Sequence, residues 1–481
     1  MDDSIPISVR GDVEDRAVDQ LRRCAQAGDA IAGLLCADGH VGYSQPIGGA
    51  VAYPDHISPS GVGYDIACGN KAVRTDVLVA DLQPDLPHVM DTIYDRISFG
   101  VGRKNEEPID HAVLDAIGDA DFAPQRGLRD LAAKQLGTVG AGNHYVDLFA
   151  GDDGHVWVGV HFGSRGFGHK TASGFLALAQ GKSFGDRGAD GEMDSPPILL
   201  AVDSELGQSY ISAMSLAGDY AYAGRDAVVA RVLDILGASS TYEVHNHHNF
   251  AWRERHFDTD VWVIRKGCTP AFPGQEGFVG ATMGEASVVL RGTDAPAGAE
   301  LLFSTVHGAG RVMSRTQAAG RMGNRAECND RDCDFWVTWR EYQHEREKHG
   351  LPGGARFTLC PRHPDGSMSK RRGRLKDGRI DFDSVKQELA SSGIELRGGA
   401  ADEAPDAYKR LDAVLDAHGD TIEILHRLTP IGVRDGRRRH LRPVQGLRTR
   451  TRSTGDIPPA DLRTSLHRHS GRGSCTFASM R

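Results

Sequence analysis

The sequence lacks the features that mark membrane and secreted proteins. No apolar run reaches the length of about 18 residues that a bilayer-spanning helix needs. The N-terminus MDDSIPISVRGDVEDR has neither the basic start nor the apolar centre of a secretion signal. Its eight cysteines are too few in 481 residues for a disulfide-dense scaffold. The sequence therefore predicts a cytoplasmic protein without a membrane partner, whose thiols are free or bind metals.

An excess of basic residues is missing as well. The chain has 56 Lys and Arg against 65 Asp and Glu, which gives a formal net charge of −9. A nucleic-acid partner would therefore need a local basic groove, which the total charge neither shows nor excludes. Apolar and charged fractions of 40% and 25% are those of a globular protein, and this length can bury a large core.

Glycine is plentiful, with 59 residues gathered in short clusters such as GNHY, HFGSRGFGH and HGAGR. Such clusters predict turns and close approaches of the backbone to a ligand or to another strand. Periodicity predicts helices at 13–27, 86–97, 125–135, 172–181 and 205–236. Strand-like runs lie at 45–53, 71–79, 156–161, 261–265 and 286–290. Because these elements follow no regular βαβ rhythm, we predict an α+β fold with mixed β-sheets and surrounding helices.

Two segments differ from the rest in composition. Residues 327–376 are charged and contain three of the cysteines. From Arg434 onward the chain has twelve Arg and three Asp with little apolar periodicity. That composition predicts a flexible C-terminal tail, and a phosphate-binding arm is the alternative.

The stretch GVGYDIACGNK, residues 61–71, places Asp65 and Cys68 three residues apart among glycines and small apolar residues. A buried, unpaired carboxylate would be costly there. Asp65 therefore either caps a local turn or holds a cation together with Cys68.

Several histidines follow apolar runs at glycine- or asparagine-rich junctions, namely His144, His161, His245 and His307. Each alone is more often a structural residue. Together with Asp65 and Cys68, however, they supply the thiolate, imidazole and carboxylate ligands of zinc, manganese or iron sites, and a thiolate can bridge two metals. Because the candidates are scattered, such a centre would be assembled from several strand ends.

The strings that contain these residues resemble the RtcB family of tRNA-splicing ligases. In the family order they are DGHVGYSQPIGG, SPSGVGYDIACG, LGTVGAGNHYVDL, VHFGSRGFGHK, VHN, RKGCTPAFPG, GATMGEASVVL, HGAGRVMSR, EAPDAYK and LTPIGVRDG. They extend over roughly residues 5–436. The resemblance implies a single large RtcB-like catalytic domain over 1–436, with 327–376 as an insertion and 437–481 as an Arg-rich tail.

The resemblance also implies an activity. Family members use GTP and manganese to join RNA 3′-phosphate or 2′,3′-cyclic phosphate ends to 5′-hydroxyl ends through a histidine–GMP intermediate. His307 would be the nucleophile. Two Mn²⁺ ions would be held by Asp65, Cys68, His144, His161 and His245. RNA and GTP would be the partners, and the resemblance leaves open whether an archease-type activator is needed.

Nine further residues resemble the nucleotide- and phosphate-binding positions of the family, namely Asn143, Asp147, Arg165, Asn246, Thr282, Ser287, Arg311, Tyr408 and Asp435. Turn and cap roles are the alternative for the two asparagines and the two arginines. The chain departs from the family at Asp147, where Glu is frequent, and at Ala281, where Gly is usual. Asp435 stands in place of a guanine-contacting lysine. This charge reversal predicts a retained but weaker preference for GTP over ATP.

Two other functions compete with ligation. One is a divergent nucleotidyltransferase that caps or repairs 3′-phosphate ends of RNA or DNA, and the other is a non-catalytic protein that binds RNA ends. The full set of ligand-type residues together with His307 favours a catalyst.

The charged insertion carries a metal-binding pattern of its own. Cys328, Cys333, Cys360 and His363 have the spacing C-x4-C-x26-C-x2-H. This spacing is compatible with a structural Cys₃His zinc site, and free thiols are the alternative.

Overall fold

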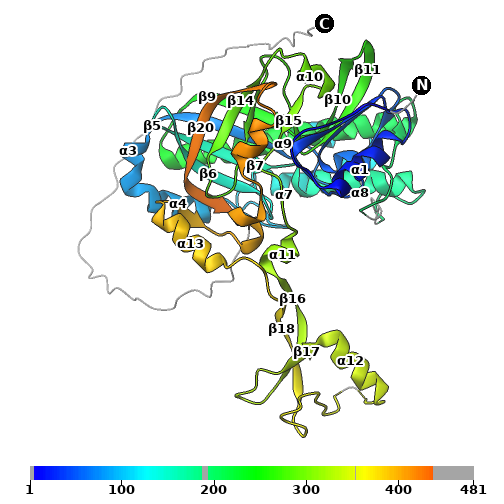
Figure 1. Cartoon of the computed structure of the whole chain (residues 1–481), viewed down its shortest axis with the longest axis vertical. Coiled ribbons are helices and arrows are strands. Elements are labelled where there is room, and N and C mark those ends of the chain that lie inside the picture. Colours follow the sequence, from blue (N-terminus) through cyan, green and yellow to red (C-terminus); the bar gives the residue numbers. More distant parts are fainter. Residues whose placement is uncertain (1–4, 187–192, 353, 437–481) are drawn as a thin grey trace, which may run out of the picture. The chain divides into compact units, whose positions relative to one another are not determined.

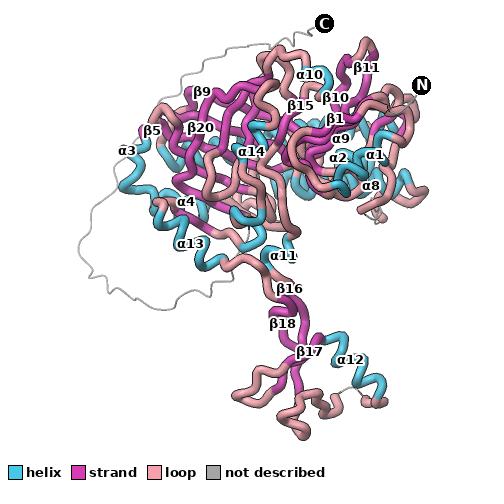
Figure 2. Tube along the Cα trace, viewed as in Figure 1, coloured by secondary structure: helices cyan, strands magenta, loops and turns pink. Residues whose placement is uncertain are grey.

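The structure of the protein is a computed structural model that describes residues 5–186, 193–352 and 354–436 (Figures 1 and 2). Helices and mainly antiparallel sheets are interleaved along the chain, which confirms the predicted α+β class. The Arg-rich tail predicted at 437–481 lies outside the described residues.

The largest sheet has eight strands and carries most of the glycine-rich junctions at its strand ends. Seven of them follow one path of antiparallel neighbours, with β19 (Glu395–Arg397) added in parallel to β20. In spatial order the path is β13 (Glu276–Val279), β14 (Ser287–Gly292), β20 (Ile422–Asp435), β6 (Tyr145–Gly151), β7 (His155–Phe162), β5 (Gly69–Leu78) and β9 (Ser240–His247).

A second, five-stranded sheet is joined to the first by a single residue. Strand β9 ends at His247 and β10 begins at Asn249. In spatial order, the strands of this second sheet are β1 (Ile7–Val9), β2 (Ala32–His40), β3 (Ile47–Tyr53), β11 (Thr259–Lys266) and β10 (Asn249–His256). Two short pairs complete this part of the described chain, β12 (Cys268–Pro270) with β15 (Ser304–Val306) and β4 (His56–Ile57) with β8 (Leu200–Ala201).

The long helix α9 (Glu205–Leu236) links two hydrophobic cores. The Ser204 hydroxyl accepts a hydrogen bond from Gly207 N at its start, and Gly237 ends it in a left-handed conformation, φ 61°. Its first half packs in a cluster with Phe175 and Ile264, whereas its second half packs against the strand residue Phe162. The observed bounds match the predicted helix 205–236.

The other helices cover the sheets. They are α1 (Asp15–Ala25), α2 (Pro59–Val62), α3 (Val79–Leu82), α4 (Leu86–Arg96), α5 (Ala112–Gly118), α6 (Ala123–Arg126), α7 (Arg129–Gln135), α8 (Arg165–Ala179), α10 (Ala297–Glu300), α11 (Arg315–Ala319), α12 (Trp339–Lys348), α13 (Phe382–Ser391) and α14 (Leu411–Asp416). Helix α8 begins seven residues before the predicted start at 172, inside a glycine-rich stretch for which the sequence predicts turns. In the described part of the chain, no helix is both long and apolar enough to span a membrane.

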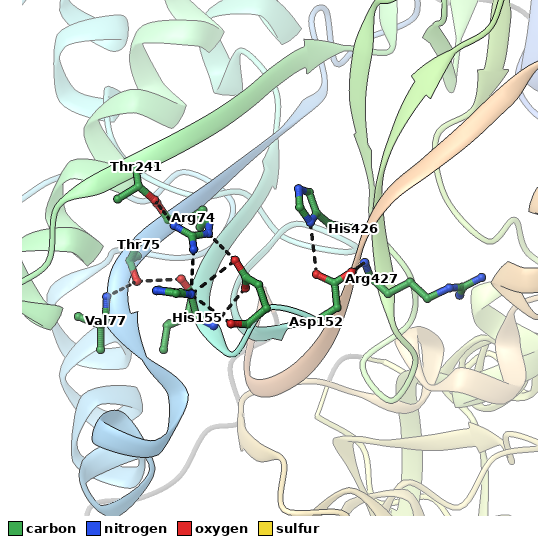
Figure 3. Close-up of polar contacts among 10 residues, drawn as sticks. Arg74, Thr75, Val77, Asp152, His155, Thr241, His426 and Arg427 are labelled. Atoms are coloured by element: carbon green, nitrogen blue, oxygen red, sulfur yellow. Dashed lines mark hydrogen bonds and ion pairs between the residues drawn. The ribbon is translucent and has the colours of Figure 1, made fainter.

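Polar side chains tie the strands together at the end away from the GNHY and HFGS junctions (Figure 3). Arg74 of β5 donates to Asp153 in the β6–β7 turn at 2.5 Å and to Thr241 of β9 at 2.8 Å. Asp152 in the same turn accepts a hydrogen bond from Arg427 N of β20 at 3.4 Å. The strands that carry the candidate site residues are therefore fixed to one another at their far ends.

The insertion forms a sheet of its own between α11 and α13. Its order is β17 (Trp336–Thr338), β16 (Arg321–Cys328) and β18 (Met368–Lys376), and helix α12 follows β17. The sheet begins at Arg321, six residues before the predicted start of the insertion at 327. Figure 1 shows this sheet as a separate element joined to the chain at the α11 end.

Candidate active site

A cavity of about 1040 Å³ brings together residues as far apart in the sequence as Asp12 and Asp435. Most of the predicted site residues line it, namely Asp65, Cys68, Asn143, His144, Asp147, His161, Thr282, His307, Arg311, Tyr408 and Asp435. Four others do not, namely Arg165, His245, Asn246 and Ser287. The family resemblance thus located the cavity from sequence, but not every residue around it.

A tight turn places Asp65 and Cys68 on the cavity wall. The preceding helix α2 begins where the Ser58 hydroxyl accepts a hydrogen bond from Gly61 N at 3.0 Å. Cys68 N then donates to Asp65 O at 3.0 Å, and Ala67 between them has a left-handed backbone, φ 59°. Since both side chains line the cavity, a carboxylate and a thiol face the same space.

Two groups of metal-ligand type share the Cys68 thiol. Asp65, Cys68 and His144 each offer a ligand atom within 4.8 Å of the others, and so do Cys68, His161 and His248. Cys68 Sγ lies 3.6 Å from His144 Nε2 and 3.5 Å from His161 Nε2. A thiolate in this position can bridge two cations.

The structure does not bring the predicted ligand His245 to either group. His245 lies on the face of β9 that is turned toward helix α9, where its Nε2 accepts a hydrogen bond from Arg225 Nε at 2.7 Å. Side chains alternate between the two faces of a strand. His248, three residues later, lies on the cavity wall and has a buried Nδ1 without a hydrogen-bond partner in the described structure. The ligand prediction for His245 is therefore corrected to His248.

The same correction applies to the neighbouring asparagine. Asn246 Oδ1 accepts a hydrogen bond from Phe278 N at 3.1 Å, away from the cavity. Asn249 lines the cavity, and its Oδ1 accepts a hydrogen bond from Gly267 N at 2.7 Å. Asn143 also lines the cavity and is exposed. The asparagine pair available to a ligand is therefore Asn143 and Asn249.

A hydrogen bond orients the His161 ring toward Cys68. Asn70 Nδ2 donates to Phe278 O at 2.8 Å, which leaves Asn70 Oδ1 to accept from His161 Nδ1 at 2.6 Å. His161 Nε2 is then unprotonated and directed at Cys68. The buried Nδ1 atoms of His144 and His248 have no hydrogen-bond partner among the described residues. The His144 nitrogen beside the thiol and the carboxylate is Nε2, which lies 3.6 Å from Cys68 Sγ and 3.0 Å from Asp65 Oδ2. Such a set of donor atoms fits divalent cations.

A fully buried arginine supports the turn that carries Cys68. Arg225 of α9 donates through Nη1 to Ala67 O at 3.0 Å and to Phe162 O at 2.7 Å, and through Nη2 to His247 Nδ1 at 2.9 Å. Burial lowers the pKa of Arg225 to about 10, so it stays charged at neutral pH. Its guanidinium thus holds the backbone beside Cys68 to the end of strand β7.

His307 is held by a buried carboxylate. Asp38 Oδ2 accepts hydrogen bonds from His307 Nδ1 at 2.6 Å, from His307 N at 3.0 Å and from Gly308 N at 3.3 Å. Burial alone would raise the pKa of Asp38, but the contacts with His307 lower it below its ordinary value. Because Asp38 fixes the proton on Nδ1, the Nε2 lone pair of His307 is free for nucleophilic attack.

The His307 ring also lies next to the metal-ligand groups. Its centroid is 4.9 Å from that of His248, in an edge-on arrangement. Gly267, with φ 65°, leaves room for the ring, since a Cβ there would come within 2.9 Å of His307 Cε1. His307 and the two groups of metal-ligand type therefore lie next to each other in the cavity.

Cationic side chains line the cavity near His307. Arg311 Nη1 donates to Tyr408 Oη at 2.7 Å, and its guanidinium lies 4.7 Å from the Tyr408 ring centre. Arg315 forms ion pairs with Asp402 and Glu403, and its side chain remains 44% exposed. Both arginines can present N–H groups to an anion.

Arg165 lies outside the cavity and holds the backbone behind it. Its Nε donates to Thr138 Oγ1 at 3.2 Å and its Nη2 to Gly100 O at 2.9 Å. These bonds hold the backbone at Gly100 and the Thr138 side chain, and the predicted phosphate contact of Arg165 stays a prediction.

Part of the cavity lining is acidic. Asp147 of β6 and Asp435 of β20 lie on the same face of neighbouring strands and are almost completely buried. Burial raises the pKa of both groups well above the ordinary value of a carboxyl group, and nearby carboxyl groups raise it further. Thr282 also lines the cavity, whereas the Ser287 hydroxyl accepts a hydrogen bond from Ala281 N at 3.0 Å and supports the loop from outside.

Sequence reasoning missed five residues of this site, namely Asp38, Arg225, His248, Asn249 and Arg315. Four of them lie in or close to recognised strings, since Asp38 opens DGHVGYSQPIGG and His248 and Asn249 come shortly after VHN. Arg315 ends HGAGRVMSR. Arg225 gave no signal, because a charged residue in an Ala-rich helix ordinarily faces solvent.

Comparison with known proteins identifies the family of this chain. The sequence model of a family described as tRNA-splicing ligase RtcB matches residues 20–343. A tRNA-splicing ligase RtcB from Thermococcus kodakarensis is 28% identical, with 84% of this chain and 87% of the relative covered. One from Pyrobaculum aerophilum is 33% identical over 60% of this chain and 74% of its own length. The RNA-splicing ligase RtcB of Escherichia coli is 27% identical, with 82% and 87% covered. Since the family match spans more than half of the 481 residues, the chain belongs to the RtcB family.

Proposed function

We propose that the protein is an RNA ligase that uses GTP and Mn²⁺ to join an RNA 3′-phosphate or 2′,3′-cyclic phosphate end to a 5′-hydroxyl end. The observation that carries the proposal is the His307–Asp38 pair beside two ligand groups that share Cys68, all in one cavity. The relatives that match the chain are themselves named as splicing ligases.

His307 would act as the nucleophile. With its proton held on Nδ1 by Asp38, Nε2 attacks the α-phosphorus of GTP, an N–P bond forms, and pyrophosphate leaves. Where the RNA end is a 2′,3′-cyclic phosphate, water first opens it to the 3′-phosphate. An oxygen of the 3′-phosphate then attacks the GMP phosphorus, so that an O–P bond forms and the N–P bond to His307 breaks. Finally the 5′-hydroxyl oxygen attacks the activated phosphate, loses its proton and releases GMP.

The residues around Cys68 fit two Mn²⁺ ions. Asp65, Cys68 and His144 would hold one ion, and Cys68, His161 and His248 the other. When bound, such ions neutralise phosphate charge and align the attacking and leaving groups. Asn143, Asn249, Arg311 and Arg315 would contribute N–H groups toward the phosphates.

Asp147 and Asp435 bear on the choice of nucleotide. Guanine offers N1–H and 2-amino donors to a carboxyl oxygen, which adenine lacks. We therefore expect GTP to be preferred over ATP. A lysine at position 435 would donate to guanine O6, an acceptor that adenine lacks, while Asp147 would still accept from the guanine donors. Asp435→Lys should therefore raise that preference by about tenfold, a difference of about 1.4 kcal/mol. An unchanged GTP-to-ATP ratio in single-turnover assays would remove Asp435 from base recognition.

The direct test is covalent labelling. The full chain is incubated with α-labelled GTP or ATP and Mn²⁺, then separated by denaturing electrophoresis. Label should remain on the protein, should be lost in His307→Ala, and should persist in the control His88→Ala, where an exposed histidine of α4 is removed. Label retained by His307→Ala would contradict the assignment.

A second assay separates ligation from the competing functions. An RNA with a 3′-phosphate is supplied with or without a 5′-hydroxyl partner strand, and with or without an archease-type activator. Joined RNA supports the ligase. Guanylylated ends without joining would instead support a capping enzyme, and labelled-RNA binding without any covalent product would support an end-binding protein.

A further inference from the structure

The insertion contains a cluster of ligand-type side chains outside the cavity. Cys328 ends β16, Cys333 follows in the next turn, and Cys360 and His363 lie in the loop before β18. Each offers one atom, and all four atoms lie within 4.8 Å of one another. Residues brought together from three separate segments of the insertion therefore converge on one point.

The spacing of these atoms is that of a tetrahedral metal site. Zinc–sulfur bonds of about 2.3 Å and zinc–nitrogen bonds of about 2.0–2.1 Å at tetrahedral angles require S···S distances of about 3.8 Å and S···N distances of about 3.6 Å. Cys333 Sγ and Cys360 Sγ are 3.5 Å apart. His363 Nδ1 lies 3.5 Å from Cys328 Sγ and 3.6 Å from Cys360 Sγ.

The backbone around the cluster is arranged in two turns. Cys333 N donates to Asp330 O at 3.3 Å, and His363 N donates to Cys360 O at 3.2 Å. His363 directs Nδ1 at the sulfur atoms, whereas its Nε2 faces Asp330 Oδ2 at 3.6 Å. A carboxylate behind a ligand histidine is a common supporting contact at zinc sites.

The insertion has too small a core to be held by apolar packing. Its hydrophobic cluster contains three buried side chains, Ala326, Tyr342 and Met368, with partly buried residues around them. Segments of this size usually need a disulfide or a metal in addition to such a core. The sulfur atoms of Cys333 and Cys360 are too far apart to be bonded, and all three cysteines of the cluster are free thiols.

We propose that the insertion is a structural zinc module in which Cys328, Cys333, Cys360 and His363 bind one Zn²⁺. Four protein ligands fill a tetrahedral shell, so this ion has no open position for substrate or water. Its role is to hold the end of β16 and the loop before β18 together. This site is independent of the proposed ligase chemistry.

The test is metal analysis of the full-length protein, purified without chelator or added metal. Because the cavity thiol could also take up zinc, the measurements use the Cys68→Ala background. We expect about one zinc per chain there. Zinc should be lost in Cys333→Ser and in Cys360→Ser, and retained in Cys24→Ala, which removes a buried thiol elsewhere.

Ligand replacement separates metal binding from packing. Histidine can replace a cysteine ligand, so Cys333→His should keep more zinc than Cys333→Ser. Co²⁺ exchanged into the same protein should give the strong visible absorption of a tetrahedral thiolate site, and Cys360→Ser should abolish it.

Four outcomes would overturn the proposal. These are the absence of zinc from the Cys68→Ala protein, zinc content unchanged by Cys360→Ser, equal zinc loss in Cys333→His and Cys333→Ser, and a Cys333–Cys360 disulfide in freshly purified protein. Limited proteolysis gives a further criterion, since chelation should expose cleavage sites within residues 321–376. Unchanged cleavage there would also contradict a structural role.

Discussion

The chain contains two clusters of cysteine and histidine that differ in how their surroundings support them. The cluster around Cys68 is supported by two sheets and by buried Arg225, and its side chains face an open cavity. The cluster around Cys360 has four side chains of metal-ligand type and only a small core beside it. Metal at an open cluster is available for chemistry, whereas metal at a closed cluster contributes to folding. The two sites should therefore respond differently to the same perturbation.

The largest effect is expected from Asp38→Asn. The amide would donate to His307 Nδ1, shift the imidazole proton to Nε2 and block attack. We expect single-turnover guanylylation to fall on the order of 10⁴-fold, the loss found when a histidine is held in the wrong tautomer. Zinc content of the insertion should not change. A loss of less than tenfold would mean that Asp38 does not set the tautomer.

Chelation should separate the two clusters by their stability. Removal of zinc should abolish hydrogen-exchange protection in β16 and β18, because structural zinc contributes folding free energy directly. Strands β5 and β7, which lie in the extended sheet, should remain protected. Equal loss of protection in both regions would show that the insertion and the sheet unfold together.

A smaller effect is expected from Arg225→Gln at the cavity cluster. Glutamine cannot bond Ala67 O, Phe162 O and His247 at once, so the turn before Cys68 should loosen. We expect Mn²⁺ affinity to fall about 10–100-fold, as for other supporting residues of metal sites. Saturating Mn²⁺ should restore most of the guanylylation rate.

The control for this variant is Arg231→Gln on the exposed side of the same helix, where Nη1 reaches Arg96 O at 3.4 Å. It should leave Mn²⁺ affinity unchanged. If Arg225→Gln lowered the rate equally at all Mn²⁺ concentrations, its role would lie outside metal binding.

The smallest effect concerns stability and pH. The pKa of Asp435 is raised in the folded state, so the folded protein holds this proton more tightly than the unfolded chain does. The free energy of unfolding therefore falls as the pH rises from the ordinary carboxyl pKa toward the pKa of Asp435 in the folded protein. Asp435→Asn should flatten this decline and stabilise the protein at high pH by about 1–3 kcal/mol. Thermal melting across pH 4–9 measures this. A parallel shift at every pH would contradict the assignment.

Helices and strands could be predicted from the sequence where interactions between residues close in the chain determine them. Helix α9 could be located to the residue because its Ser204 cap and Gly237 stop adjoin a periodic sequence. The sequence did not predict strand β20, because LTPIGVRD contains proline and glycine. Its pairing with β6 stabilises the strand in spite of these residues. Tertiary pairing of this kind is not encoded in local periodicity.

The candidate site shows the same limit. Asp65 and Cys68 could be read from one short string, since a single turn positions both. The choice between His245 and His248 depends on where β9 ends, and sequence alone does not fix a strand end to one residue. Arg225 could not be found at all, because its partners are backbone oxygens contributed by other segments.

The one-residue link between strands β9 and β10 of the two large sheets does not tolerate a change in length. His248 is the entire connection between β9 and β10, and consecutive Cα atoms are held about 3.8 Å apart. One added or deleted residue would reverse the alternation of side chains on one sheet relative to the other and carry the imidazole off the cavity wall. Related chains should therefore differ in residue type around this junction while keeping its length constant.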